Sequence, residues 1–354
     1  MPQSGDPLKI AQIAPLAESV PPQLYGGTER VVSYLTEELV RLGHEVTLFA
    51  SGDSRTGARL VPCSRRALRL DPAVKDPLAH VVLMLEKVRQ RAHEFDVLHF
   101  HADHLHLPLF RPCARKTVTT LHGRLDLPDL APLYAEFHDM PLVSISASQR
   151  RPLARAGWIG TVHHGLASSV CPFNGSPRGG YLAFLGRVSP EKGLERAIAI
   201  ARAAGTRLRI AAKVDAADQR YFRDEIAPLL GDPLIEFLGE VSERQKWDLL
   251  GNARALLFPI DWPEPFGLAM IEAMSCGTPV IAWPHGAVPE IVDPGVTGYI
   301  VGSVAEAAAA AGGIARLDRE QVRLRFEERF SAARMARDYV QVYRSLSERA
   351  ASAA

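Results

Sequence analysis

The chain has 354 residues, a length that suits two domains, each able to bury its own hydrophobic core. Hydrophobic residues make up 47% of it and charged residues 23%, which is ordinary for a soluble α/β enzyme. The net charge of +1 gives no reason to expect a nucleic-acid partner.

The cysteines are far apart and share no metal-ligand spacing: they are Cys63, Cys113, Cys171 and Cys276. We therefore expect reduced thiols in a cytoplasmic protein. The polar residues 1–9 lack the apolar core of a signal peptide. No apolar run approaches the roughly 18 residues that a membrane-spanning helix needs, so any membrane contact is expected to be peripheral.

Short apolar segments alternate with helical patterns in the first half of the chain. A helix is expected at 28–42, where apolar residues recur on one face and Gly43 follows as a stop. The expected strands are 8–14, 45–50, 96–100, 117–121 and 142–145. Strands that are nearly all apolar and alternate with helices indicate a parallel sheet covered on both faces.

Glycines and prolines gather between residues 163 and 180, after which the alternation restarts. The expected strands of the second half are 181–185, 208–212, 234–238, 255–258 and 279–282. Its expected helices are 193–204, 216–230, 267–276 and a closing helix at 332–350. The sequence therefore predicts two doubly wound domains, 1–168 and 169–331, joined by a hinge. Ligands in such sheets bind at the carboxyl ends of strands, which suggests a cleft between the domains.

The segment 262–272 reads WPEPFGLAMIE and holds two carboxylates around a helix start. Pro265 favours an extended Glu264 in the loop, whereas Glu272 lies on the helix, about 7–8 Å beyond its start. Anions or sugar oxygens can bind the backbone N–H groups there, those of Phe266, Gly267 and Leu268. The carboxylates would repel a diphosphate, but each can accept hydrogen bonds from hydroxyls, one on a sugar and one on a ribose.

Glu264 and Glu272, spaced E-x7-E around this PFGL sequence, resemble the signature of the retaining family 4 glycosyltransferases. The resemblance covers nearly the whole chain and implies the GT-B fold, two Rossmann-like domains that face each other across a cleft. It also implies an acceptor side in residues 1–168 and a donor site in 169–331. The closing helix, 332–354, is then expected to pack back on the first domain, which periodicity alone leaves open.

Gly26 and Gly27 precede the first expected helix, where a backbone without side chains can approach a phosphate. The resemblance implies that they belong to a loop that closes over the donor phosphates. The chain has no G-x-G-x-x-G motif, which counts against a nicotinamide or flavin enzyme.

Arg187 and Lys192 follow the first strand of the second half, Arg187 as a forked donor and Lys192 as a point charge. The resemblance implies that both neutralise the leaving diphosphate. It places Lys213 beside the nucleotide and Val241 against its base.

His122 ends a strand of the first half, and the resemblance implies that it contacts the donor sugar and that its carbonyl stabilises an oxocarbenium-like charge. Gly123 follows it where many relatives carry Asp, so any role of that side chain is missing here. With Arg187, Lys192 and Glu264, His122 completes the expected catalytic set.

The histidines at 99, 101, 104 and 106 resemble a metal box. A polar loop at a strand end that touches the acceptor is the favoured interpretation, and no D-x-D motif stands out. We therefore expect no metal and no cofactor.

These patterns predict a retaining enzyme that moves a hexose from a nucleotide-diphosphate sugar to an acceptor hydroxyl by a front-face, metal-independent reaction. UDP-glucose is the favoured donor, GDP-mannose the next, and the acceptor is a small molecule, a glycan or a lipid-linked group. A GT-B nucleotide-sugar epimerase, a retaining phosphorylase and a non-enzymatic sugar-nucleotide-binding protein remain open. The sequence identifies neither the acceptor nor the oligomeric state.

Overall fold

The computed structural model describes residues 6–23, 26–168 and 172–352. It divides into two compact units, one formed by Met1–Gly165 with Ala332–Ala354 and the other by Leu166–Ser331. We call them unit 1 and unit 2. The expected boundary after residue 168 adjoins residues 169–171, which lie outside the described residues.

Unit 1 is built on a parallel sheet whose strand order is β3-β2-β1-β4-β5-β6-β7. The strands are β1 (Lys9–Ile13), β2 (Glu45–Ser51), β3 (Arg59–Ser64), β4 (Val97–Phe100), β5 (Thr117–Thr120), β6 (Leu142–Ser144) and β7 (Trp158–Thr161). The central strands are almost entirely buried and mostly apolar, with Gln12 of β1 and His99 of β4 among their few buried polar side chains. The chain reverses its direction of travel across the sheet between β1 and β4, which makes the carboxyl ends of these two strands the switch point.

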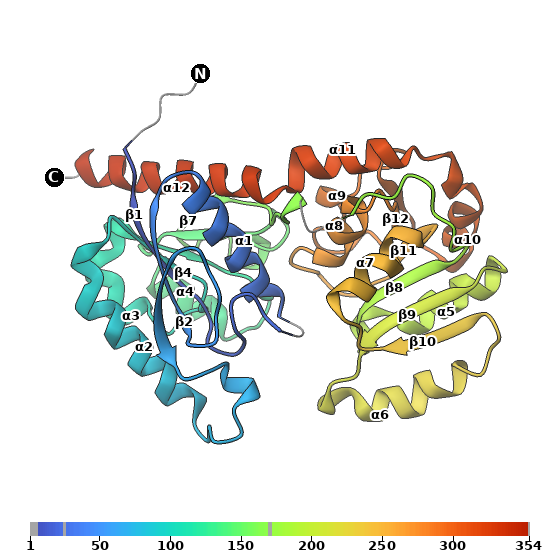
Figure 1. Cartoon of the computed structure of the whole chain (residues 1–354), viewed down its shortest axis with the longest axis horizontal. Helices are drawn as coiled ribbons and strands as arrows, with labels where there is room; N and C mark the ends of the chain where they lie inside the picture. The colour runs from blue at the N-terminus through green and yellow to red at the C-terminus, as the bar shows by residue number, and fades with distance from the viewer. Residues whose placement is uncertain (1–5, 24–25, 169–171, 353–354) are drawn as a thin grey trace. The chain divides into compact units, whose positions relative to one another are not determined.

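Helices cover both faces of this sheet. They are α1 (Gly27–Arg41), α2 (Pro77–Arg91), α3 (Leu107–Phe110), α4 (Leu130–Glu136) and α12 (Ala332–Ser352), with short 3₁₀ turns between them. One core joins α2 to β1, β2 and β4, whereas a smaller one joins Val32 of α1 to Leu48 and Ala50 of β2. The last helix, α12, packs against α1 and buries Tyr339 and Tyr343 within unit 1 (Figure 1).

Unit 2 repeats the architecture with the order β10-β9-β8-β11-β12-β13. Its strands are β8 (Leu182–Arg187), β9 (Leu208–Lys213), β10 (Ile235–Gly239), β11 (Ala255–Phe258), β12 (Val280–Ala282) and β13 (Gly298–Ile300). Here the switch point lies between β8 and β11. Both units therefore have the doubly wound order that the alternating pattern predicts.

The helices of unit 2 are α5 (Leu194–Ala203), α6 (Gln219–Tyr221), α7 (Glu243–Asn252), α8 (Leu268–Ser275), α9 (Val288–Ile291), α10 (Val304–Gly313) and α11 (Arg319–Phe330). The helix expected at 216–230 is present as a continuous run of helical turns that change type: a 3₁₀ turn at Ala216–Asp218, α6, a π turn at Phe222–Ile226 and a 3₁₀ turn at Ala227–Leu229. Pro228 lacks a backbone N–H and its ring clashes with the carbonyl four residues earlier, which accounts for the irregular turns around it.

Three strands that the sequence does not predict, β3, β7 and β13, all lie at sheet edges. Edge strands pair on one side only and carry mixed polarity, as the exposed positions of β3 and β7 illustrate. They therefore lack the continuous apolar run that marks the central strands.

Candidate active site

The carboxyl ends of β8 and β9 bring two cations together in unit 2. Arg187 and Lys213 are the last residues of these neighbouring strands and are aligned in register. Asp215 accepts from Arg187 at 3.4 Å and forms an ion pair with Lys213 at 3.1 Å. Burial alone would raise the pKa of Asp215, but Lys213 and Arg187 hold it below its ordinary value. Asp215 thus occupies a position between two cations where an anion is stabilised.

Lys192 lies in the turn after β8 and is ion-paired to Glu264. The carboxylate of Glu264 also accepts from the indole Nε1 of Trp262 at 3.0 Å. Lys192 lies 4.9 Å from the centre of the Trp262 ring, within cation–π range. The next residue, Gly193, has φ +69°, and a Cβ there would come 2.2 Å from the carbonyl oxygen of Pro259. Glycine is therefore needed where this turn meets the first residue of α5.

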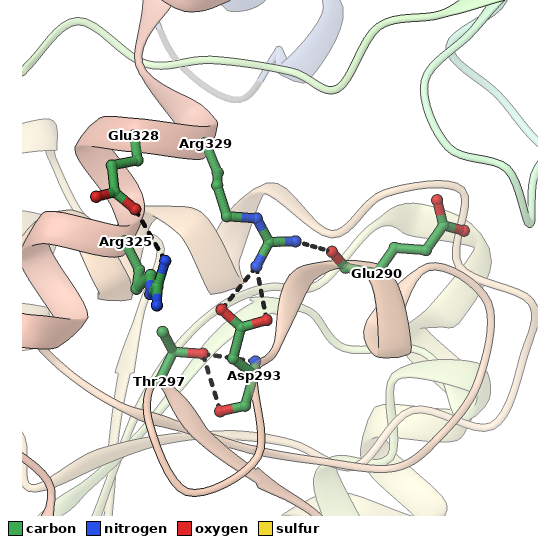
Figure 2. Close-up of polar contacts among 6 residues, drawn as sticks. All are labelled: Glu290, Asp293, Thr297, Arg325, Glu328 and Arg329. Atoms are coloured by element: carbon green, nitrogen blue, oxygen red, sulfur yellow. Dashed lines mark hydrogen bonds and ion pairs between the residues drawn. The ribbon is translucent and has the colours of Figure 1, made fainter.

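The loop that carries Glu264 is supported from behind by α9 and α11. The backbone N–H of Ala287 donates to the carbonyl of Glu264 at 2.9 Å, just before α9. After α9, Asp293 accepts two hydrogen bonds from Arg329 of α11, at 2.7 and 2.8 Å (Figure 2). Arg329 also donates to the carbonyl of Glu290 (Figure 2). Arg329 thus holds the C-terminal part of the segment 287–293, while the bond from Ala287 joins its first residue to the Glu264 loop.

Glu272 lies one turn into α8, where its side chain is largely buried and pairs with Lys246 of α7 at 2.5 Å. Lys246 is also 4.2 Å from the centre of the Trp247 ring. Val241 is half-buried between β10 and α7, whose N-terminus is closed by a capping box on Ser242.

At the start of α8, Gly267 adopts φ +88°, a conformation that favours glycine. Phe266 is 2% exposed and packs edge-on against Phe330, with ring centres 6.1 Å apart. Its side chain therefore belongs to the core, and only its backbone could serve a ligand. Leu268 is the first residue of α8.

In unit 1 the first helix, α1, begins at Gly27, after Gly26. A Cβ on Gly26 would come 2.8 Å from Cβ of Pro22 and 3.2 Å from a carboxylate oxygen of Glu29. The loop therefore tolerates no side chain at Gly26. Burial raises the pKa of Glu29, whose neighbour in the loop is Glu18. Residues 24 and 25 lie outside the described residues.

His122 follows β5 in a loop whose backbone is held by Gln149. The amide nitrogen of Gln149 donates to the carbonyls of Leu121 and Gly123, at 2.8 and 2.9 Å, on either side of His122. Its amide oxygen accepts from the backbone of Ile145 at 2.9 Å. Burial lowers the pKa of His122 to about 3, so its ring is neutral at physiological pH.

The interpretation of these histidines as a polar loop is wrong for three of them, because His99, His101 and His106 are buried and hydrogen-bonded within unit 1. His99 contacts Tyr343 and Thr120, His101 contacts Gln12 and His122, and His106 contacts Thr119. Among the described residues, no group of three or more His, Cys, Asp or Glu side chains has the arrangement of a metal site.

The predicted donor residues thus fall into three contacts in unit 2: Arg187 and Lys213 through Asp215, Lys192 with Glu264, and Glu272 with Lys246. Gly26, Gly27 and His122 lie in unit 1. Sequence reasoning missed the partners Asp215, Trp262, Lys246 and Gln149. Trp262 opens the WPEPFGLAMIE segment and Asp215 lies two residues after Lys213, whereas Lys246 and Gln149 act across 26 residues or more.

Two doubly wound sheets, the second with cations gathered at its strand ends, define the class of GT-B transferases. Residues 25–178 match the family model described as "Glycosyltransferase Family 4", and residues 174–334 match "Glycosyl transferases group 1". The chain belongs to these family 4, group 1 glycosyltransferases and transfers a sugar from a nucleotide sugar.

Similar proteins extend over most of the chain. A phosphatidyl-myo-inositol mannosyltransferase of Mycolicibacterium smegmatis is 27% identical, with 92% of this chain and 88% of that protein covered. A glycogen synthase of Mycobacterium tuberculosis is 26% identical over 78% and 79% of the two chains. The crystal structure of AviGT4, a glycosyltransferase involved in avilamycin A biosynthesis, matches with a TM-score of 0.72 and 27% identity, covering 97% and 98%.

Within the described part of the chain, none of the helices combines the length and apolar character needed to cross a membrane.

Proposed function

We propose that the chain moves a hexose from a nucleotide-diphosphate sugar to an acceptor hydroxyl with retention of configuration. The observation that carries the proposal is the alignment of Arg187 and Lys213 at adjacent strand ends, with Asp215 between them. A donor diphosphate brings the negative charge that Asp215 supplies in the free protein, and it would replace that carboxylate between the two cations.

Departure of the nucleoside diphosphate builds negative charge on its terminal phosphate. Arg187 and Lys192, fixed by the strand end and by the turn after it, stabilise that charge without a metal ion. In a front-face reaction the acceptor oxygen attacks C1 on the side from which the phosphate leaves. The acceptor proton passes to an oxygen of the leaving phosphate, so no protein nucleophile is required.

The remaining residues position the donor. Glu264 accepts hydrogen bonds from hydroxyls of the sugar once Lys192 turns to the phosphate. Glu272 accepts hydrogen bonds from hydroxyls of the ribose. His122 contacts the sugar from unit 1, with Gly26 and Gly27 closing over the phosphates and Val241 bordering the base. Gly267 and Leu268 contribute backbone N–H groups.

UDP-glucose is the favoured donor and GDP-mannose the next. The names of the similar proteins, a mannosyltransferase and a glycogen synthase, support these two sugars as candidates. The acceptor is a small molecule, a glycan or a lipid-linked group. The described cysteines Cys63, Cys113 and Cys276 are free thiols, which suits the reducing cytoplasm.

Calorimetry with UDP, GDP and ADP tests the donor site directly. We expect one of the three to bind wild-type protein, and Arg187→Ala to weaken that binding by at least tenfold. Addition of EDTA should leave both binding and turnover unchanged. A folded Arg187→Ala variant with wild-type affinity would remove the proposed diphosphate site.

A further inference from the structure

A line of hydrogen bonds runs through unit 1 from the C-terminal helix to His122. The hydroxyl of Tyr343, on α12, contacts Nε2 of Gln12 on β1 at 3.0 Å. Oε1 of Gln12 contacts Nε2 of His101 at 2.8 Å, and Nδ1 of His101 contacts Nε2 of His122 at 2.9 Å. Gln12, Tyr343 and His101 are almost completely buried, so water cannot substitute for any of these partners.

The chemistry of Gln12 fixes the direction of this line toward His122. An amide oxygen can only accept, so the hydrogen of His101 must be on Nε2. Burial among other histidines holds the pKa of His101 well below its ordinary value, so the ring is neutral and has no second hydrogen. Nδ1 of His101 is therefore an acceptor, and His122 donates to it from Nε2. That assignment leaves Nδ1 of His122 without a hydrogen.

The other end of the line gives the amide nitrogen of Gln12 its partner. The amide nitrogen of Gln12 can only donate, so the Tyr343 hydroxyl accepts its hydrogen. That hydroxyl then donates its own hydrogen to Nδ1 of His99, at 2.8 Å. Nε2 of His99 in turn donates to the hydroxyl of Thr120 at 2.7 Å. Tyr343 thus supplies the acceptor that the Gln12 amide nitrogen needs in this orientation.

We propose that Tyr343 and Gln12 are positioning residues that keep His122 in one tautomer, with its hydrogen on Nε2 and a lone pair on Nδ1. Nδ1 is buried and has no hydrogen-bond partner among the described residues. An unpaired buried acceptor is costly, and a hydroxyl of the donor sugar supplies the missing hydrogen. This last step rests on the proposed function, which places the sugar against His122.

The tautomer of His122 can be measured in the absence of any nucleotide sugar. In ¹⁵N-histidine-labelled full-length protein, ring-nitrogen chemical shifts distinguish a nitrogen that carries hydrogen from one that does not. A His122→Gln spectrum assigns the signals. We expect wild-type His122 to carry its hydrogen on Nε2, and Tyr343→Phe, which frees the Gln12 amide to turn over, to introduce the Nδ1–H tautomer.

Tyr339→Phe is the matched control. Tyr339 is on the same helix and equally buried, but its hydroxyl contacts Thr120 at 2.9 Å, beyond His99 and off the path from Gln12 to His122. We expect similar falls in melting temperature for the two variants, a changed His122 tautomer in Tyr343→Phe alone, and at least a tenfold lower kcat in that variant alone.

Gln12→Glu gives an independent reading. Both carboxylate oxygens accept, so His122 should keep its hydrogen on Nε2, while Tyr343 must now donate to residue 12 and His99 must move its hydrogen to Nδ1. A wild-type His122 with hydrogen on Nδ1, or a Tyr343→Phe tautomer identical to wild type, would overturn the proposal. Absence of turnover with every donor would instead contradict the proposed function, because the tautomer is read without donor.

Discussion

Gly286 lies directly against the backbone of Glu264: a Cβ atom on Gly286 would come 2.3 Å from both the backbone nitrogen and the carbonyl oxygen of Glu264. Gly286 also has φ +58°, which L residues with side chains rarely adopt. The Glu264 loop therefore depends on a glycine more than twenty residues further along the chain. Any side chain at 286 displaces the loop that carries Glu264 and Trp262.

Gly286→Ala should weaken donor binding and turnover by at least tenfold while the rest of unit 2 remains folded. Gly295→Ala is the matched control, since Gly295 has φ +78° with nothing within 4 Å of the added Cβ. Both variants incur a backbone strain of about 1–2 kcal/mol, but only Gly286→Ala places a side chain against the backbone of Glu264. Calorimetry and steady-state kinetics would compare them, and equal losses in the two would contradict this view of Gly286.

Arg187→Ala and Lys192→Ala should each lower turnover by about two to three powers of ten, the scale for loss of one preorganised charge stabiliser. Arg209→Ala serves as control because Arg209, near the opposite end of β9, pairs with Glu236 and lies 5.0 Å from the centre of the Tyr181 ring, and the proposal gives neither contact a part in diphosphate binding. Turnover of the Arg187 or Lys192 variant within a few-fold of the Arg209 variant would mean that the diphosphate binds elsewhere.

Glu272→Ala should weaken binding of the free nucleoside diphosphate, because the ribose hydroxyls lose their acceptor. Hydrogen bonds to charged groups are worth about 1.5–3 kcal/mol, which corresponds to at least a tenfold loss. Glu272→Gln keeps an acceptor oxygen and breaks only the ion pair with Lys246, so its loss should be smaller. Unchanged diphosphate affinity in a folded Glu272→Ala protein would remove Glu272 from the ribose site.

Unit 1 should lose stability in mild acid. Burial lowers the pKa of five histidines, to about 3 for His106 and His122 and well below 6.5 for His99, His101 and His164. In the unfolded chain all five titrate near pH ~6.5. Below that pH the unfolded state binds more protons, so the free energy of unfolding falls as pH decreases, by about 1.4 kcal/mol per pH unit for each histidine.

Urea unfolding at pH 7.5, 6.5 and 5.5 would measure this fall. The loss should appear below pH ~6.5 and steepen toward pH 5.5, in step with protonation of the unfolded chain. A free energy of unfolding that is constant between pH 7.5 and 5.5 would show that these rings are protonated in the folded protein.

The sequence carries enough information for the central strands and the donor motif because both depend on neighbouring residues. Strands such as β1 and β11 can be recognised in the sequence because most of their residues are apolar. The extended Glu264 loop follows from Pro265, and the helix start follows from Gly267. Edge strands depend on the sheet to which they pair, so the sequence pattern does not reveal them, and the pattern also gives no sign of the π turn before Pro228.

Most residues that hold the site residues in place could not be predicted from the sequence, because they contact the site from distant positions in the chain. Gln149 holds the His122 loop through carbonyls 28 and 26 residues away, and Gly286 lies against Glu264 because the segment before α9 packs on the Glu264 loop. From the sequence alone the histidine pattern at 99–106 is interpreted as a polar loop, but only the fold reveals that His99 is buried and bonds to Tyr343, 244 residues away.

The stereochemistry of the product tests the central claim most directly. With UDP-α-glucose or GDP-α-mannose and an accepted hydroxyl, or with water in slow hydrolysis, ¹H NMR followed during the reaction reads the anomer first formed. We predict an α product, with one nucleoside diphosphate released for each sugar transferred. A β product would contradict retention, and a sugar 1-phosphate or an epimerised sugar without equimolar nucleoside diphosphate would contradict glycosyl transfer itself.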